Sequence, residues 1–121
     1  MANTFKLFTI ADVAVDSGTF STLYTVAGST TAVVLGMNIC NKDGAEQDVT
    51  VKLTSDTANR TGANNAANES VTLLNETTVP ADSTLEVFAG QKIVLEATDV
   101  ITIGASVASS LDVTMSVMEI T

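Results

Sequence analysis

TLEVFAGQKIVLEATDVITIGASVASSLDVTMSVMEI, residues 84–120, places an apolar residue at nearly every second position and is cut into short pieces by turn residues. Its last piece has two interleaved sets of side chains: Leu111, Val113, Met115 and Val117 against Asp112, Thr114, Ser116 and Met118. A two-residue period is that of a strand with one face in a core and one in water, whereas a helix repeats every three or four residues. The stretch therefore predicts antiparallel strands.

The same alternation recurs in three further groups: Ile101, Ile103, Ala105 and Val107; Val33, Leu35, Met37 and Ile39; and Val49, Val51 and Leu53. The chain is thus predicted to be all-β, an antiparallel β-sandwich or jelly-roll-like fold of about eight to nine short strands. We expect strands at Phe5–Ile10, Phe20–Val26, Thr31–Cys40, Asp48–Ser55, Val71–Val79, Thr84–Phe88, Lys92–Glu96, Val100–Val107 and Leu111–Ile120. Clusters of Gly, Pro, Asp and Ser separate them.

The length of 121 residues fits one domain, so we expect a single β-sandwich over residues 1–121. Residues 1–19 form its N-terminal strand or arm. Hydrophobic residues make up 45% of the chain, but aromatic residues only 4%, so the core must be built from aliphatic side chains and Met.

The segment 56–70, DTANRTGANNAANES, has neither the strand nor the helix period and is too polar for a core. A connection of this length without regular structure is usually functional or mobile. We predict a long exposed loop with Asn59, Arg60, Asn64 and Asn65 as contact residues. A hairpin tip without any partner remains the alternative.

Acidic residues outnumber basic ones by 14 to 5, which gives a formal net charge of −9. Nucleic acids and anionic membranes are bound through Lys and Arg, so neither is an expected partner. No signal peptide and no apolar run of membrane-spanning length is found, so synthesis in the cytoplasm is expected. The single cysteine, Cys40, excludes an internal disulfide and is predicted to be a half-buried small apolar residue.

No catalytic or cofactor-binding pattern is found. The chain has no histidine, no glycine-rich phosphate loop and no CxxC motif, so we expect no enzyme activity and no cofactor. The paired carboxylates Glu96 and Asp99 lack an aromatic-lined cleft that could hold a sugar. Residues 41–48 contain acidic and amide side chains in an incomplete calcium-loop spacing, so we predict a hairpin with Asp43 and Gly44 at its tip and no metal site.

Two ordered series of strand and turn residues resemble small virion structural proteins of tailed bacteriophages, particularly marine and cyanobacterial ones. The first half contributes Leu23-Tyr24-Thr25-Val26, Gly28, Thr31-Ala32-Val33-Val34-Leu35-Gly36, Asn38, Asn41-Lys42 and Asp48-Val49-Thr50-Val51-Lys52-Leu53. The second half contributes Val79-Pro80-Ala81, Ser83-Thr84-Leu85, Gly90-Gln91-Lys92-Ile93-Val94-Leu95-Glu96-Ala97, Asp99-Val100-Ile101, Leu111-Asp112-Val113 and Ser116-Val117-Met118-Glu119-Ile120. The likeness covers most of the chain from Leu23 onward.

This resemblance implies a non-enzymatic virion protein with a β-sandwich fold that assembles on a phage particle. Expected roles are capsid decoration, binding the particle surface as a symmetric oligomer such as a homotrimer, or a place in the collar, tail or fibre base. The implied partners are further copies of the chain and major capsid, neck or tail proteins. A carbohydrate-binding module for host surfaces is the alternative from another class.

A docking strand is expected at the N-terminus. An unpaired edge at Phe5–Ile10 can add to the sheet of a neighbouring protein, and the alternating Phe5 and Leu7 can fill its groove. We therefore predict Phe5, Leu7 and Phe8 as protein-binding residues. The alternative is that these side chains are covered by their own domain.

Overall fold

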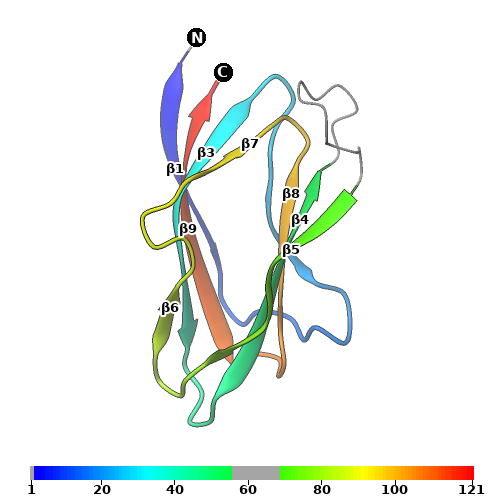
Figure 1. The fold of residues 1–121 in the computed structure, drawn as a ribbon, viewed down its shortest axis with the longest axis vertical. Coiled ribbons are helices and arrows are strands. Elements are labelled where there is room, and N and C mark those ends of the chain that lie inside the picture. Colours follow the sequence, from blue (N-terminus) through cyan, green and yellow to red (C-terminus); the bar gives the residue numbers. More distant parts are fainter. Residues whose placement is uncertain (1, 56–68) are drawn as a thin grey trace.

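The computed structural model describes residues 2–55 and 69–121, in which two antiparallel sheets face each other across a shared core (Figure 1). All nine predicted strands are present in these ranges, and the prediction of an antiparallel β-sandwich is confirmed. Their bounds are β1 (Asn3–Ile10), β2 (Ser21–Thr25), β3 (Thr31–Asn41), β4 (Gln47–Ser55), β5 (Glu69–Val79), β6 (Thr84–Glu86), β7 (Ile93–Leu95), β8 (Val100–Ala105) and β9 (Leu111–Ile120).

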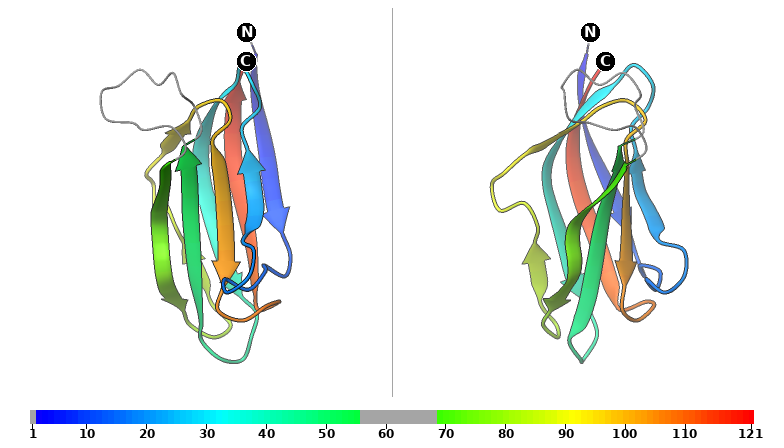
Figure 2. Two further views of the ribbon diagram at one scale, coloured as in Figure 1. Left: turned by 90° about the vertical axis from the view of Figure 1, so that its right-hand side faces the viewer. Right: turned by 45° about the vertical axis from the view of Figure 1, so that its right-hand side comes forward.

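The strand order is that of a jelly roll in which two short strands, β6 and β7, share one position. One sheet has the order β1-β9-β3-β6, with β7 also pairing with β3. The other has the order β2-β8-β4-β5. The two layers stand side by side in Figure 1 and one in front of the other in the left view of Figure 2, and both termini lie at the same end of the sandwich.

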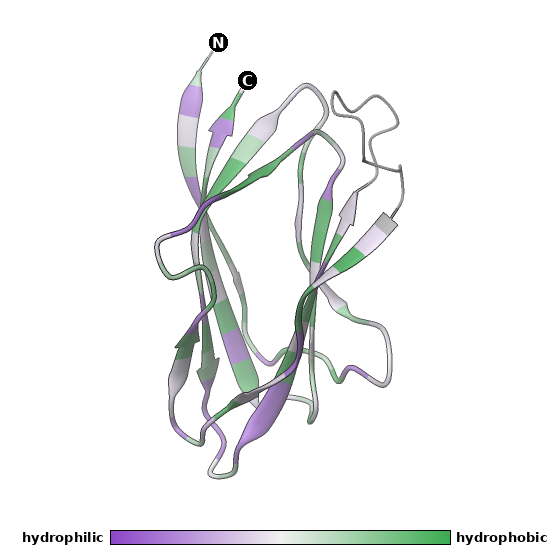
Figure 3. Cartoon of the chain, in the orientation of Figure 1, coloured by the Kyte–Doolittle hydropathy of each residue, from purple (hydrophilic) through white to green (hydrophobic). Residues whose placement is uncertain are grey.

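The core lies between the sheets and is mainly aliphatic, as the composition predicts. Apolar and polar residues interleave along the strands, so that one face of each strand turns inward (Figure 3). Among the described residues, Tyr24 and Phe88 are the aromatic members of this core. The largest fully buried side chains include Met37, Ile39, Leu95, Ile101, Ile103, Leu111 and Met115.

The strand alternation predicted for β3 is only half right, because a β-bulge interrupts it. Val34 pairs with Val117 and Gly36 pairs with Ser116, so Leu35 is the extra residue. A bulge shifts the inward parity by one position. Val33 and Leu35 therefore lie on the outer face, whereas Met37 and Ile39 point inward as predicted. Val107 is also exposed, because it lies beyond the end of β8.

The predicted hairpin around Asp43 and Gly44 is wrong, because β3 and β4 belong to different sheets and the connection between them crosses the sandwich. Buried Asn41 holds this crossing together. Its Nδ2 donates to the carbonyls of Ala45 (3.0 Å), Val79 (3.0 Å) and Pro80 (3.2 Å). Its Oδ1 accepts the backbone N–H of Asp43 at 2.9 Å. Asn41 thus satisfies backbone groups that the crossing takes out of either sheet.

Candidate protein-binding surface

The first strand, β1, lies at an edge of its sheet and presents two large apolar side chains to solvent. Within residues 2–55 and 69–121 it pairs with β9 alone, in unbroken register from Asn3–Ile120 to Ile10–Val113. Phe5 is 72% exposed and Leu7 is 63% exposed. An edge strand of eight residues with exposed apolar side chains is a template for pairing with another chain. This surface therefore resembles a protein-binding site more than an ordinary solvated edge.

The predicted docking residue Phe8 has a different position from Phe5 and Leu7. It is partly buried against the core, and its ring lies 4.4 Å from that of Tyr24, centroid to centroid. Phe8 thus anchors β1 to its own domain. Of the three side chains predicted on this strand, the structure leaves Phe5 and Leu7 on the open face and turns Phe8 inward.

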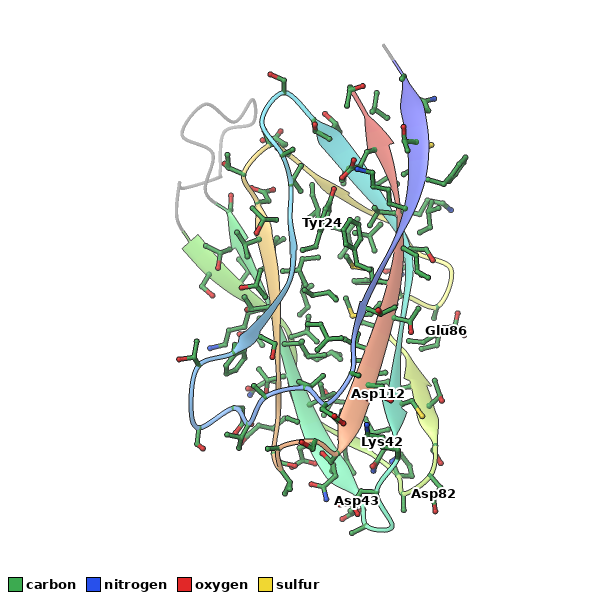
Figure 4. All side chains as sticks on the ribbon, turned by 180° about the vertical axis from the view of Figure 1, so that it is seen from behind. Tyr24, Lys42, Asp43, Asp82, Glu86 and Asp112 are labelled. Atoms are coloured by element: carbon green, nitrogen blue, oxygen red, sulfur yellow. The ribbon has the colours of Figure 1, made fainter. Side chains whose placement is uncertain are left out.

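A buried acid adds a second anchor for β1. Lys6 Nζ lies 2.8 Å from Glu119 Oε1, and the Tyr24 hydroxyl donates to Glu119 Oε2 at 2.5 Å. The Glu119 side chain, from β9, is only 9% exposed. The three residues come from β1, β2 and β9, so this cluster joins the two sheets at the β1 edge. Figure 4 shows Tyr24 between the sheets.

The pKa values of this cluster follow from its geometry. The Lys6 ammonium, and then the Tyr24 hydroxyl, hold the pKa of Glu119 below its ordinary value. Burial, strengthened by the neighbouring Glu119, raises the pKa of Tyr24 well above its ordinary value. Glu119 is therefore ionised and Tyr24 neutral at physiological pH, so the hydrogen bond between them stabilises the fold.

An exposed ionic cluster fixes the other end of β1. Lys42 Nζ contacts carboxylate oxygens of Asp12 and, at 3.0 Å, of Asp112. The backbone N–H of Asp12 also donates to Asp112 Oδ1 at 2.9 Å, and this hydrogen bond, together with Lys42, lowers the pKa of Asp112. Hydrogen bonds to both carboxylates raise the pKa of Lys42. Lys42 and Asp112 are adjacent at the end of the sandwich far from the termini (Figure 4).

The carboxylates that resemble a calcium loop are used within the protein. Asp43 accepts hydrogen bonds from the Gly44 backbone N–H at 2.7 Å and from Gln47 Nε2 at 2.7 Å. Asp48 Oδ1 accepts from Thr78 Oγ1 at 2.8 Å. In residues 2–55 and 69–121, no group of three or more acidic, Cys or His side chains is placed to hold a metal ion. The Asp43 oxygens thus stabilise the connection between β3 and β4, and Asp48 joins β4 to β5.

Two further predictions concern Cys40 and the segment 56–70. Cys40 is exposed on the outer face of β3, so the prediction of a half-buried residue is wrong. Ile39 points inward, so the alternation along β3 turns its neighbour Cys40 outward. Glu69 and Ser70 belong to β5 and pair with β4, whereas the predicted contact residues Asn59, Arg60, Asn64 and Asn65 lie outside the described residues.

Within the described ranges, no helix is long and apolar enough to cross a membrane. No protein-family model matches the chain, and no curated protein matches its sequence.

Solved structures with a similar fold exist. A chain of the IBDV viral particle is 8% identical, with a TM-score of 0.54 over 97% of this chain and 30% of that one. The VP2 subviral particle of infectious bursal disease virus gives 9% identity and a TM-score of 0.49 over 97% and 32%. Bacillus endospore appendages, described as disulfide-linked pili, give 15% identity and a TM-score of 0.48 over 98% and 88%. At these identities the likeness concerns the fold, and the chain spans about a third of the two viral chains.

Proposed function

We propose that this chain is a non-enzymatic structural protein of a tailed-phage virion that decorates the capsid and binds its surface as a symmetric oligomer, a trimer. A place in the collar, tail or fibre base is the alternative within the same class. The observation that carries the proposal is the edge strand β1, which is locked in place by its inner side chains and offers Phe5 and Leu7 outward.

The inward side chains of β1 hold the strand in its own domain and the outward ones are exposed, which supports a docking role. Its inward residues, Lys6 and Phe8, contact Glu119 and Tyr24, so the strand is ordered before any partner arrives. A preformed strand loses little conformational entropy on binding, which favours strand addition to a neighbouring sheet. Many weak contacts of this kind become firm attachment when several copies bind one symmetric surface.

The fold comparison also supports the proposal. A chain of the IBDV viral particle has a similar fold, so this fold occurs in at least one viral particle. The alternative of a carbohydrate-binding module has less support, because Tyr24, the single tyrosine, is buried and cannot serve as a platform for a sugar ring.

The test is recovery of the chain with virus particles. An antibody against the purified protein is used to label intact tailed particles from the source of the sequence, and then heads and tails separated after disruption. Labelling of heads supports decoration, and labelling of collars or tails supports the alternative position. Absence from all particle fractions, while the protein is detected free in the lysate, would overturn the proposal. Reproducible sugar binding on a glycan array would favour the carbohydrate-binding module instead.

The docking strand is tested separately by point substitution. Removing residues 1–10 would uncover β9 and leave Glu119 without Lys6, so a deletion confounds docking with folding. Phe5→Ser together with Leu7→Ser changes outward side chains only. We expect this variant to fold and to be lost from particles. Val71→Thr, an exposed apolar residue on the opposite sheet, is the matched control and should be incorporated normally.

A further inference from the structure

A row of apolar side chains crosses the outer face of the five-stranded sheet. On neighbouring strands Phe5 pairs with Met118, Met118 with Val33, and Val33 with Val94. Paired residues project from the same face of a sheet, so the four side chains form one continuous row. Phe5 is the most exposed member, and Val94 at the far end is 60% exposed. This surface is called the outer row below.

A hollow lies beside the outer row. It has a volume of about 340 Å³, and its lining includes Leu35 and Gly36 of the bulge together with polar Asn38 and Ser116 and acidic Glu86. Leu7 pairs with Ser116, and Ser116 with Gly36, so the protruding Leu7 and the hollow occupy the next row of the same face. One face thus carries both a projection and a recess. In a symmetric oligomer each copy can offer the projection to one neighbour and the recess to another.

Charged residues are absent from the outer row itself, whereas Glu86 lines the hollow beside it. The outward positions of the five strands include two charged side chains, Glu86 and Asp112, both in the half remote from the termini. Lys92 and Glu96, directly outside the ends of β7, add one charge of each sign at the rim. In a chain of net charge −9, the four residues of the outer row include no carboxylate, so two copies can meet there with least repulsion.

The area agrees with a small interface between copies. Taking about 100 Å² of apolar area for each fully exposed side chain of these types, the outer row with Leu7 and Leu35 exposes roughly 300 Å². A specific interface at the small end of the standard range buries about 600 Å² per partner, of which roughly 340 Å² is apolar. The outer row with Leu7 and Leu35 therefore supplies most of the apolar area that such a contact needs.

We infer that the outer row is the self-association surface of this protein and that its occupant is a second copy of the same chain. The projecting Phe5 and Leu7 of one copy seat against the outer row and hollow of the next. A partner selected by charge would find no charged side chain among the four residues of the outer row. The inference deepens the proposed function, on which it rests for the role of the oligomer, because it names the surface that joins the copies.

The test is the mass of the purified protein in solution. Sedimentation equilibrium at about 10–500 μM, in reducing buffer because Cys40 is exposed, should give an average mass rising above one 12.5 kDa chain. Val94→Thr should raise the dissociation constant at least tenfold, and Phe5→Ser should leave a monomer. Val71→Thr, at 49% exposure on β5, should behave as wild type. Far-UV circular dichroism must show the same β spectrum for all four proteins.

The two substitutions distinguish contact through the outer row from strand pairing along the β1 edge. Val94 lies on β7, with β9 and β3 between it and β1, so it takes no part in pairing along the β1 edge. If Phe5→Ser abolishes association and Val94→Thr does not, the outer row is not the contact and the inference fails. A wild-type monomer at every concentration also overturns it. Neither result bears on recovery with particles, which tests the proposed function alone. A stable dimer would leave the outer row as the contact surface but refute the trimer.

Discussion

Replacing Tyr24 by Phe removes a single hydroxyl from the cluster of Lys6, Tyr24 and Glu119 that holds β1 to the sandwich. The ring of Phe keeps the contact with Phe8, so packing is preserved. What is lost is the hydrogen bond to Glu119, which is nearly buried and ionised. Hydrogen bonds to charged groups contribute about 1.5–3 kcal/mol, and a buried acceptor that loses its donor is the costly case. We expect the free energy of unfolding to fall by about 2 kcal/mol.

The assay is urea denaturation followed by far-UV circular dichroism, because the chain has no tryptophan and the variant removes its one tyrosine. For a domain of this size, about 2 kcal/mol corresponds to a melting temperature roughly 8 °C lower. The urea dependence of the unfolding free energy should stay unchanged, which would show that the compactness of both states is preserved.

The pH dependence offers an independent check. The pKa of Tyr24 is raised in the folded protein, so its contribution is complete below the unfolded pKa of about 10 and declines as pH rises above it. Wild type should therefore lose its advantage over the Tyr24→Phe variant progressively as the pH rises above about 10. A difference below about 0.5 kcal/mol at neutral pH, or one that does not change in alkali, would refute the reasoning.

Three further predictions concern other sites. Glu119→Gln should remove a stability term that wild type has above the unfolded pKa of Glu and loses as pH falls through the lowered folded pKa, so the two acid denaturation curves should converge at low pH. Asn41→Ala should lower the unfolding free energy by about 2–4 kcal/mol, measured in urea, because several buried backbone groups lose their partner; a change below 1 kcal/mol would contradict this. Gly104→Ala should cost about 1–3 kcal/mol by thermal melting, because the added Cβ would lie 2.9 Å from Asp16 Cβ, whereas Gly28→Ala, with nothing within 4 Å, should be near neutral.

The sequence was sufficient for the type and number of the strands. The two-residue period of Leu111–Ile120 survives in the structure as alternating burial along β9, because one buried face imposes that period on any strand. The same period in Phe5–Ile10 predicted β1 and its two apolar side chains, Phe5 and Leu7. Their exposure was one of two alternatives that the sequence left open, because alternation does not say which of two faces is covered.

Features that depend on pairing partners were missed for a common reason. The bulge at Leu35 is visible only against the register of β9, and without it the parity of Val33 is misassigned. The turn at Asp43 has the composition of a hairpin, yet the neighbours of β3 and β4 place them in opposite sheets. Local sequence contains the turn chemistry but not the identity of the strand that supplies hydrogen bonds.

By itself the sequence determined an all-β chain with an aliphatic core and an acidic surface, since periodicity and composition act locally and need no partner. The tertiary structure alone decided that β1 ends a sheet, that Glu119 meets Lys6 and Tyr24, and that Phe5, Met118, Val33 and Val94 align in one row. Those contacts join residues up to about a hundred positions apart, and only long-range strand pairing brings them together.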